Sequence, residues 1–274
     1  MALSADDEIF VAEVRDAYEA LLSPANGRVR RSDALWNQFE AVVADYANGN
    51  AHERTLLEKV NELAVASEIA MDPTLRGTIE YEPDILPSGR RIDFVADRGK
   101  DLVYVEVKTV RPEAGDEEEN RRLYAARTVF HPENVHYIVG GDIGGTIYAN
   151  SFRARAHFLD YSLEFESRLA EARENGRGGP GILVFCGTGF QWRVDELEDF
   201  ADFYHAGSHR QDDAFGPMEA HNLAKRRVTL TRIIDHFAFL KRPANLARRT
   251  EFHFPVKGPW FLGPQMGGTR QGRR

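Results

Sequence analysis

The stretch Leu102–Val110 constrains the fold most, because it is apolar and β-branched at nearly every other position. Together with the polar turn at residues 98–101, it predicts the second arm of a β-hairpin, in a half-buried or central strand. Side chains alternate along a strand, so one face should carry Val103, Val105, Val107 and Thr109. The opposite face should then carry Tyr104, Glu106 and Lys108.

The turn also predicts the register of this hairpin. If Asp97 pairs with Leu102, Asp93 lies directly opposite Glu106 on the same face of the sheet. Side chains opposed in this way have Cβ atoms about 5 Å apart. The hairpin therefore places two carboxylates and the ammonium group of Lys108 close together.

Two carboxylates this close repel each other by about 3 kcal/mol at an effective dielectric constant of ~20. Lys108 supplies one compensating charge, and a divalent ion would supply the rest. Oxygen ligands select a hard ion such as Mg²⁺ or Mn²⁺. The alternative is that Glu106 and Lys108 form a solvated surface pair and Asp93 is incidental.

Asp93, the hairpin and the sequence Glu106-Val107-Lys108 resemble the PD-(D/E)xK nuclease superfamily, whose members carry an acid on one strand and Glu-x-Lys on the next. The resemblance covers roughly residues 52–140. Residues 61–66 look like the acidic helix of that superfamily, and residues 81–91 look like the strand and loop that lead into the catalytic hairpin. Ile92 stands where many members have proline, and the Gln-x-x-x-Tyr signature of one subgroup is missing.

This resemblance implies a metal-dependent phosphodiesterase that acts on nucleic acid, and we expect it to be an endonuclease. Asp93, Glu106 and the backbone carbonyl of Val107 would hold Mg²⁺ or Mn²⁺, and Lys108 would orient the attacking water. The acidic helix, expected over about residues 51–71, offers Glu62 and Glu68, which both lie off the centre of its buried face. The resemblance favours Glu62 as a metal ligand, and we expect Glu68 to be a solvated helix charge.

The order of the expected elements predicts an α/β fold, in which a mixed sheet is flanked by helices around a restriction-endonuclease-like core. We expect an N-terminal helical segment over residues 1–50 and the core over residues 51–215. A basic C-terminal extension with a disordered tail should cover residues 216–274. Within the core, residues 146–150 are expected as a strand and residues 152–174 as a long helix.

Charge is distributed unevenly along the chain. The net charge is −8, yet residues 222–274 contain twelve Lys or Arg and only two acidic residues. Such segregation suits a protein that binds a polyanion, and DNA is favoured over RNA as the partner. The basic pairs and triplets expected to contact phosphates are Lys225, Arg226, Arg227, Arg248 and Arg249. They could equally neutralise the acidic body of the protein.

Arg90 and Arg91 flank the hairpin acids, where they would either grip phosphate oxygens or form surface salt bridges. The single cysteine, Cys186, lies in an apolar run and is expected to be a buried strand thiol, which excludes an internal disulfide and fits the cytoplasm. No apolar run has the ~20 residues of a membrane span. A homodimer would suit cleavage of two strands.

A second hypothesis follows from the same residues. The protein would be a non-catalytic nucleic-acid-binding or assembly module on a nuclease-like fold. In that case the basic C-terminal residues provide the activity, and the acids of the hairpin have a structural role.

Overall fold

The computed structural model describes residues 3, 5–24, 27–51, 53–72, 75, 77–99, 101–110, 146–188, 194–207 and 217–242. Its centre is a six-stranded sheet whose strands lie side by side in chain order. The strands are β1 (Val29–Arg30), β2 (Ile79–Tyr81), β3 (Phe94–Asp97), β4 (Leu102–Val110), β5 (Gly181–Thr188) and β6 (His236–Arg242). The sheet is mixed: β2, β3 and β4 are antiparallel neighbours, whereas β1 runs parallel to β2 and the strands β4, β5 and β6 run parallel to one another.

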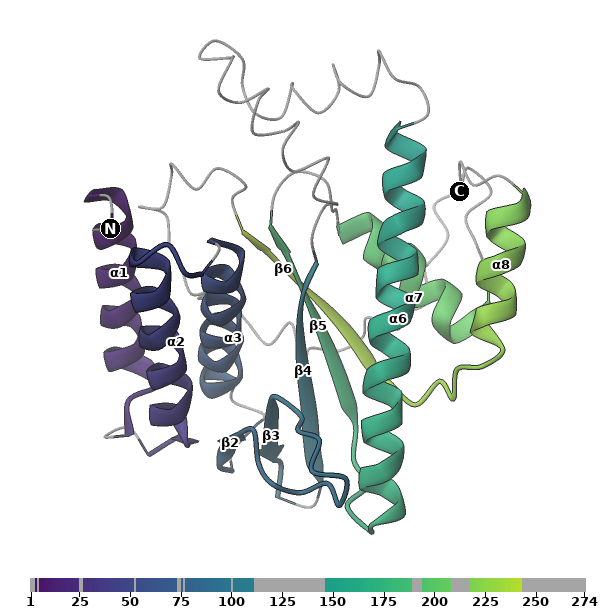
Figure 1. Ribbon diagram of the computed structural model, residues 1–274. Helices are drawn as coiled ribbons and strands as arrows, with labels where there is room; N and C mark the ends of the chain where they lie inside the picture. The colour runs from purple at the N-terminus through teal and green to yellow at the C-terminus, as the bar shows by residue number, and fades with distance from the viewer. Residues whose placement is uncertain are drawn as a thin grey trace, which may run out of the picture.

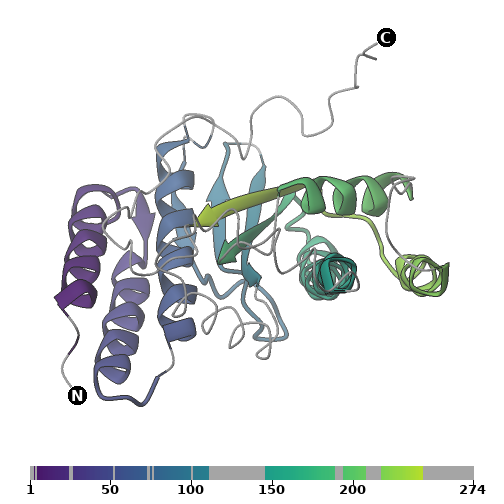
Figure 2. The ribbon, with the colours of Figure 1, turned by 90° about the horizontal axis from the view of Figure 1, so that it is seen from above.

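Helices cover both faces of this sheet, as Figures 1 and 2 show. One layer consists of α1 (Ala5–Leu21), α2 (Ser32–Ala47) and α3 (Glu53–Met71). The other consists of α6 (Thr146–Glu174), α7 (Val194–Ala206) and α8 (Pro217–Arg227). The expected α/β class, a mixed sheet flanked by helices, is confirmed.

Strand β4 divides the two layers because its side chains alternate between them. Val103, Val105 and Val107 join the apolar cluster formed with α1, α2 and α3. Tyr104 joins the second cluster, formed with α6, α7 and α8. The apolar residues of β4 are thus buried on both faces, as suits a strand in the interior of a sheet with helices on either side.

The predicted hairpin register is confirmed. Asp97 pairs with Leu102 and Phe94 pairs with Val105. Continuing this ladder by one residue places Asp93, just before β3, across from Glu106. The turn residue Gly99 has a φ of 96°, a conformation that glycine adopts without strain.

Several expectations are wrong. Residues 146–150 are not a strand but the first turns of α6. Glu68 is not solvated, since only 4% of it is exposed. The sequence also predicts a helix over residues 120–130 and a strand over residues 135–139, and both segments lie outside the described residues.

The segment expected as a C-terminal extension contributes to the core. Strand β6 pairs with β5 over seven residues, and Leu223 of α8 and Phe237 of β6 are buried in the cluster beneath α6. The N-terminal helices are also integral, because Phe10 of α1 and Phe39 of α2 pack in the same cluster as Val60 of α3. The sheet therefore extends past the expected boundaries at residues 50 and 215.

Two further observations concern the chain as a whole. Cys186 is buried in β5 and carries a free thiol, as expected. None of the helices in the described part of the chain is long and apolar enough to cross a membrane.

Candidate metal and phosphodiester site

Asp93 and Glu106 meet where the pairing of β3 with β4 ends. Phe94 is the last β3 residue paired with β4. The next β4 N–H that faces β3, that of Val107, therefore has no β3 backbone partner. The Asp93 carboxylate replaces it: Oδ2 of Asp93 accepts a hydrogen bond of 2.7 Å from the Val107 N–H. The N–H and C=O of one strand residue point to the same side, so the carbonyl of Val107 also faces Asp93.

Glu106 is held by two cations. Its Oε1 lies 2.9 Å from Nζ of Lys108 and 2.8 Å from Nη1 of Arg168, and only 1% of the Glu106 side chain is exposed. The other oxygen, Oε2, is buried and has no hydrogen-bond partner within the part of the chain that is described. An ionised carboxylate oxygen left unpaired in the interior is costly, so this atom requires an explanation.

Glu106 contributes to a shift in the ionisation of Asp93. Burial, and then the negative charges of Glu106 and Glu62, raise the pKa of Asp93 well above its usual range, against the opposing effects of the Val107 N–H and Lys108. Burial alone would lower the pKa of Lys108, but the carboxylates of Glu106, Asp93 and Glu164 raise it overall. The ammonium group is thus held charged beside a carboxyl group that resists ionisation.

Glu62 approaches from the opposite helix layer, on α3. Both of its oxygens lie 2.9 Å from Nζ of Lys59, and its Oε2 accepts a hydrogen bond of 3.0 Å from the hydroxyl of Tyr81. Burial raises the pKa of Glu62, although Lys59 and Tyr81 oppose this. Glu62 therefore interacts with Asp93 through its charge, while its own oxygens contact Lys59 and Tyr81.

Arg168 and Glu164 complete the site from α6, and neither was foreseen as a site residue. Glu164 lies one turn before Arg168 and pairs with its Nη2, and its Oε2 lies 3.5 Å from Nζ of Lys108. The spacing of an acid four residues before an arginine is a recognisable helix pair. From the sequence alone, such a pair is expected to lie on the exposed face of a helix. Only the packing of α6 on β4 brings it to Glu106.

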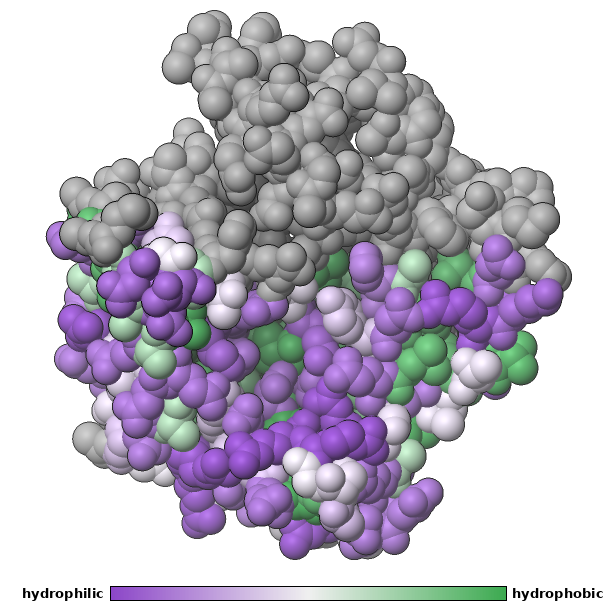
Figure 3. All heavy atoms as spheres, in the orientation of Figure 1, coloured by the Kyte–Doolittle hydropathy of each residue, from purple (hydrophilic) through white to green (hydrophobic). Residues whose placement is uncertain are grey.

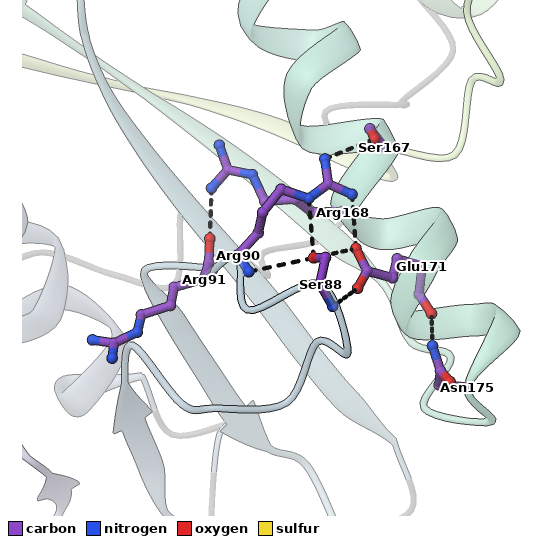
Figure 4. Close-up of polar contacts among 7 residues, drawn as sticks. All are labelled: Ser88, Arg90, Arg91, Ser167, Arg168, Glu171 and Asn175. Atoms are coloured by element: carbon purple, nitrogen blue, oxygen red, sulfur yellow. Dashed lines mark hydrogen bonds and ion pairs between the residues drawn. The ribbon is translucent and has the colours of Figure 1, made fainter.

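Arg90 and Arg91 both form ion pairs within the protein. Nη1 of Arg91 lies 2.9 Å from Oε2 of Glu82, and Nη2 of Arg90 lies 2.7 Å from Oε2 of Glu171 on α6. Figure 4 shows the guanidinium groups of these neighbours pointing in different directions, with Arg90 over α6 and Arg91 away from it. Nearly half of each side chain is nevertheless exposed, so both can still meet a ligand.

The loop between β2 and β3 is fastened to α6 at the same place. Glu171 accepts hydrogen bonds from the N–H and the hydroxyl of Ser88, at 2.7 and 2.8 Å, and Nη1 of Arg90 donates to the hydroxyl of Ser167 at 3.0 Å. We call these contacts among Ser88, Arg90, Ser167 and Glu171 the loop clasp (Figure 4). The clasp fixes the segment that leads directly into Asp93.

Of the basic residues of α8, two contact other helices of the protein and one is exposed to solvent. Arg226 pairs with Asp160 of α6, and Arg227 donates from Nη2 to the carbonyl of His205, 3.3 Å away at the end of α7. A cation at the C-terminal end of a helix is stabilised by the negative end of the helix dipole. Lys225 is exposed. Arg248 and Arg249 lie outside the described residues.

Figure 3 shows the surface of the molecule in the orientation of Figure 1. Hydrophilic side chains dominate its lower part, over β2, β3 and the loop between them. The side chains of Asp84, Ser88 and Arg90 in this loop are all exposed. The surface over this end of the sheet is therefore polar.

Few oxygen atoms at this site are available to bind a hard divalent cation. Across the described ranges, no group of three or more Asp, Glu, His or Cys side chains is arranged to hold a metal ion. What these ranges do provide is the Asp93 carboxylate, the unpaired Oε2 of Glu106 and the facing carbonyl of Val107. Two carboxylates and a carbonyl, with water completing the shell, are the kind of incomplete oxygen set that Mg²⁺ accepts.

Comparison of the chain with protein-family models, with curated proteins and with solved structures finds no match.

Proposed function

We propose that this protein is a Mg²⁺- or Mn²⁺-dependent nuclease, with DNA as the favoured substrate and a restriction-endonuclease-like core. The observation that carries the proposal is the buried, unpaired Oε2 of Glu106 across from Asp93. Two adjacent carboxylates and an unsatisfied oxygen are unfavourable for the fold alone, and a bound divalent ion would relieve both. The single buried thiol fits a reducing cytoplasm.

Asp93, Oε2 of Glu106 and the Val107 carbonyl are the atoms that would hold the ion. When bound, a divalent ion supplies polarisation of the scissile phosphate and lowers the pKa of a water molecule. Lys108 is placed to hold the attacking water and to offset charge that develops on the phosphate, because its ammonium group contacts Glu106 and 20% of its side chain is exposed. Arg91, about half exposed, is the described arginine best placed to contact a phosphate oxygen beside the site.

The test is a cleavage assay on labelled single- and double-stranded DNA and RNA, with Mg²⁺, Mn²⁺ or EDTA. We expect cleavage of DNA that requires the metal, and a loss of at least about 100-fold in rate in Asp93→Asn and in Lys108→Met. Lys108→Arg should not restore the rate, because a planar guanidinium does not replace a compact ammonium group.

Asp97→Asn is the matched control, since it removes a carboxylate from the exposed end of the same strand, where Asp97 accepts a hydrogen bond from the Gly99 N–H. This variant should cleave like the wild type. Wild-type rates in Asp93→Asn or Lys108→Met would refute the proposed site.

A specific observation favours the alternative, a nucleic-acid-binding module without turnover. Lys108 and Arg168 both already contact Glu106, so protein cations compensate part of its charge. Binding of DNA without cleavage under every metal would select this alternative. Steep salt dependence of that binding would then show that phosphate contacts provide the affinity.

A further inference from the structure

Arg168 connects the two halves of the candidate site through one atom. Its Nη1 lies 2.8 Å from Oε1 of Glu106 on β4 and donates a hydrogen bond of 2.7 Å to the backbone carbonyl of Arg91. Arg91 precedes Asp93 by two residues. One nitrogen therefore contacts both the strand that carries Glu106 and the segment that carries Asp93.

The side chain of Arg168 is fixed in this position. Only 9% of it is exposed, and its second terminal nitrogen pairs with Glu164 of the same helix. A guanidinium group is planar and presents its donors in a rigid fork, so fixing one nitrogen also fixes the direction of the other. Figure 4 shows the group extending from α6 to the Arg91 carbonyl, next to the loop clasp.

Neutralisation of charge is not the main effect of Arg168. Glu164 contacts Arg168 and also lies 3.5 Å from Nζ of Lys108, so it cancels part of the positive charge that the two cations bring. What Arg168 adds beyond Lys108 is direction, because both cations contact the same oxygen, Oε1. The carboxylate of Glu106 is then oriented with Oε2 as the oxygen that remains for a ligand.

We infer that Arg168 is a positioning residue, which holds Oε1 of Glu106 and the Arg91 carbonyl together so that Oε2 and Asp93 face one ion. This inference rests on the proposed function, because it assigns Oε2 to a divalent cation. Groups that orient metal ligands in this way contribute about 10- to 100-fold to metal affinity or activity.

The experiment measures Mn²⁺ affinity of the full chain by electron paramagnetic resonance, together with cleavage as a function of Mn²⁺ concentration. In Arg168→Met we expect Mn²⁺ affinity to fall by about 10- to 100-fold, with DNA binding in EDTA unchanged. Arg168→Lys should recover only part of this loss. The lysine side chain is shorter, and its single ammonium nitrogen replaces a planar guanidinium group with two terminal nitrogens.

Arg173→Met is the matched control. Arg173 lies on the same helix and is 40% exposed, and its Nη2 lies 4.0 Å from Asp235 and 3.3 Å from the Ile233 carbonyl, away from Glu106. This variant should bind Mn²⁺ like the wild type. Thermal unfolding of each variant is recorded in EDTA, and Arg168→Lys keeps the test decisive if Arg168→Met does not fold, because it retains the charge beside Glu106.

The outcomes separate the inference from the function on which it rests. Wild-type Mn²⁺ affinity in a folded Arg168→Met or Arg168→Lys overturns the inference and leaves the proposed nuclease intact. Tighter Mn²⁺ binding in Arg168→Met also overturns it, because Arg168 would then act as a competing counter-ion. A wild-type protein that binds no Mn²⁺ overturns the proposed function, and the positioning role with it.

Discussion

The folded protein disfavours a negative charge on Asp93, because burial and the carboxylates of Glu106 and Glu62 all raise its pKa. Asp93→Asn should remove this unfavourable charge while keeping an oxygen for the Val107 N–H. Without metal at pH 7, we expect the free energy of unfolding to rise by about 0.5 to 2 kcal/mol, as measured by urea denaturation.

The pH dependence of that gain follows from the sign of the shift. A carboxyl group whose pKa is raised by folding destabilises the protein as the pH rises above its unfolded value of 3.8. The advantage of Asp93→Asn should therefore shrink as the pH falls toward 3.8, and it should be lost below that value, where both the folded and the unfolded wild type carry the proton. An equal advantage at pH 7 and pH 4, or none at pH 7, would contradict this account.

At the residue scale, the sequence predicts what lies close along the chain. Asp93, Glu106 and Lys108 come together through strand alternation and one turn, both of which are local rules. Arg168, Glu164 and Tyr81 could not be assigned this way, because their contacts with Glu106, Lys108 and Glu62 depend on how helices pack on the sheet. The burial of Glu68 was missed for the same reason: a single helical wheel does not show what covers its flank.

At the scale of elements, α6 determines the geometry of the loop that precedes Asp93. The loop clasp joins Ser88 and Arg90 to Glu171, and the adjacent Arg168 reaches the Arg91 carbonyl. The same helix shows where sequence reasoning fails. Thr146, Ile147 and Tyr148 favour a strand locally, yet these residues begin a helix of 29 residues, as happens when the surrounding structure overrides a weak local preference.

The loop clasp should weaken in acid. The hydrogen bond from the Ser88 N–H and the contacts with Arg90 lower the pKa of Glu171 below its ordinary 4.5. A carboxyl group whose pKa is lowered by folding stabilises the protein above its unfolded pKa, and this contribution is lost as the pH falls through the folded value. Glu171→Gln should therefore lower the urea midpoint at pH 7, and the difference from the wild type should shrink when it is measured again at a pH well below 4.5.

Glu174→Gln, at an exposed position on the same helix, is the matched control and should leave the midpoint unchanged at both pH values. If Glu171→Gln matched the wild type at pH 7, the loop clasp would not contribute to stability.

At the scale of the whole molecule, the sheet brings together residues that are far apart in the chain. Strand β6 closes the order β1 to β6 although it begins at residue 236, and it runs parallel to β5. The class of fold followed from the pattern of helices and strands, whereas the place of β6 did not, because its basic sequence context indicated a partner-binding extension. Parallel pairing between distant segments has no local signal comparable with a hairpin turn.

The charge distribution yields a prediction about DNA binding. Of the basic clusters, Arg226 and Arg227 contact Asp160 and the end of α7, whereas Arg248 and Arg249 lie beyond the described residues. If these last two contact phosphates, Arg248→Gln with Arg249→Gln should reduce the slope of log affinity against log salt by up to about two units, as measured by fluorescence anisotropy.

Arg30→Gln with Arg98→Gln removes the same charge from exposed positions elsewhere and serves as the control. A similar change in slope for both double variants would mean that overall charge, and not a phosphate contact at these two positions, determines the affinity.

The buried position of Cys186 in β5 has a practical consequence for such experiments. It is the only cysteine in the chain and is inaccessible, so thiol reagents should leave the folded wild type unlabelled. A cysteine introduced at the exposed Asp84 would then be the sole site of attachment for a spin label or fluorophore. Such a probe would report movement of the loop before Asp93 without background from the rest of the molecule.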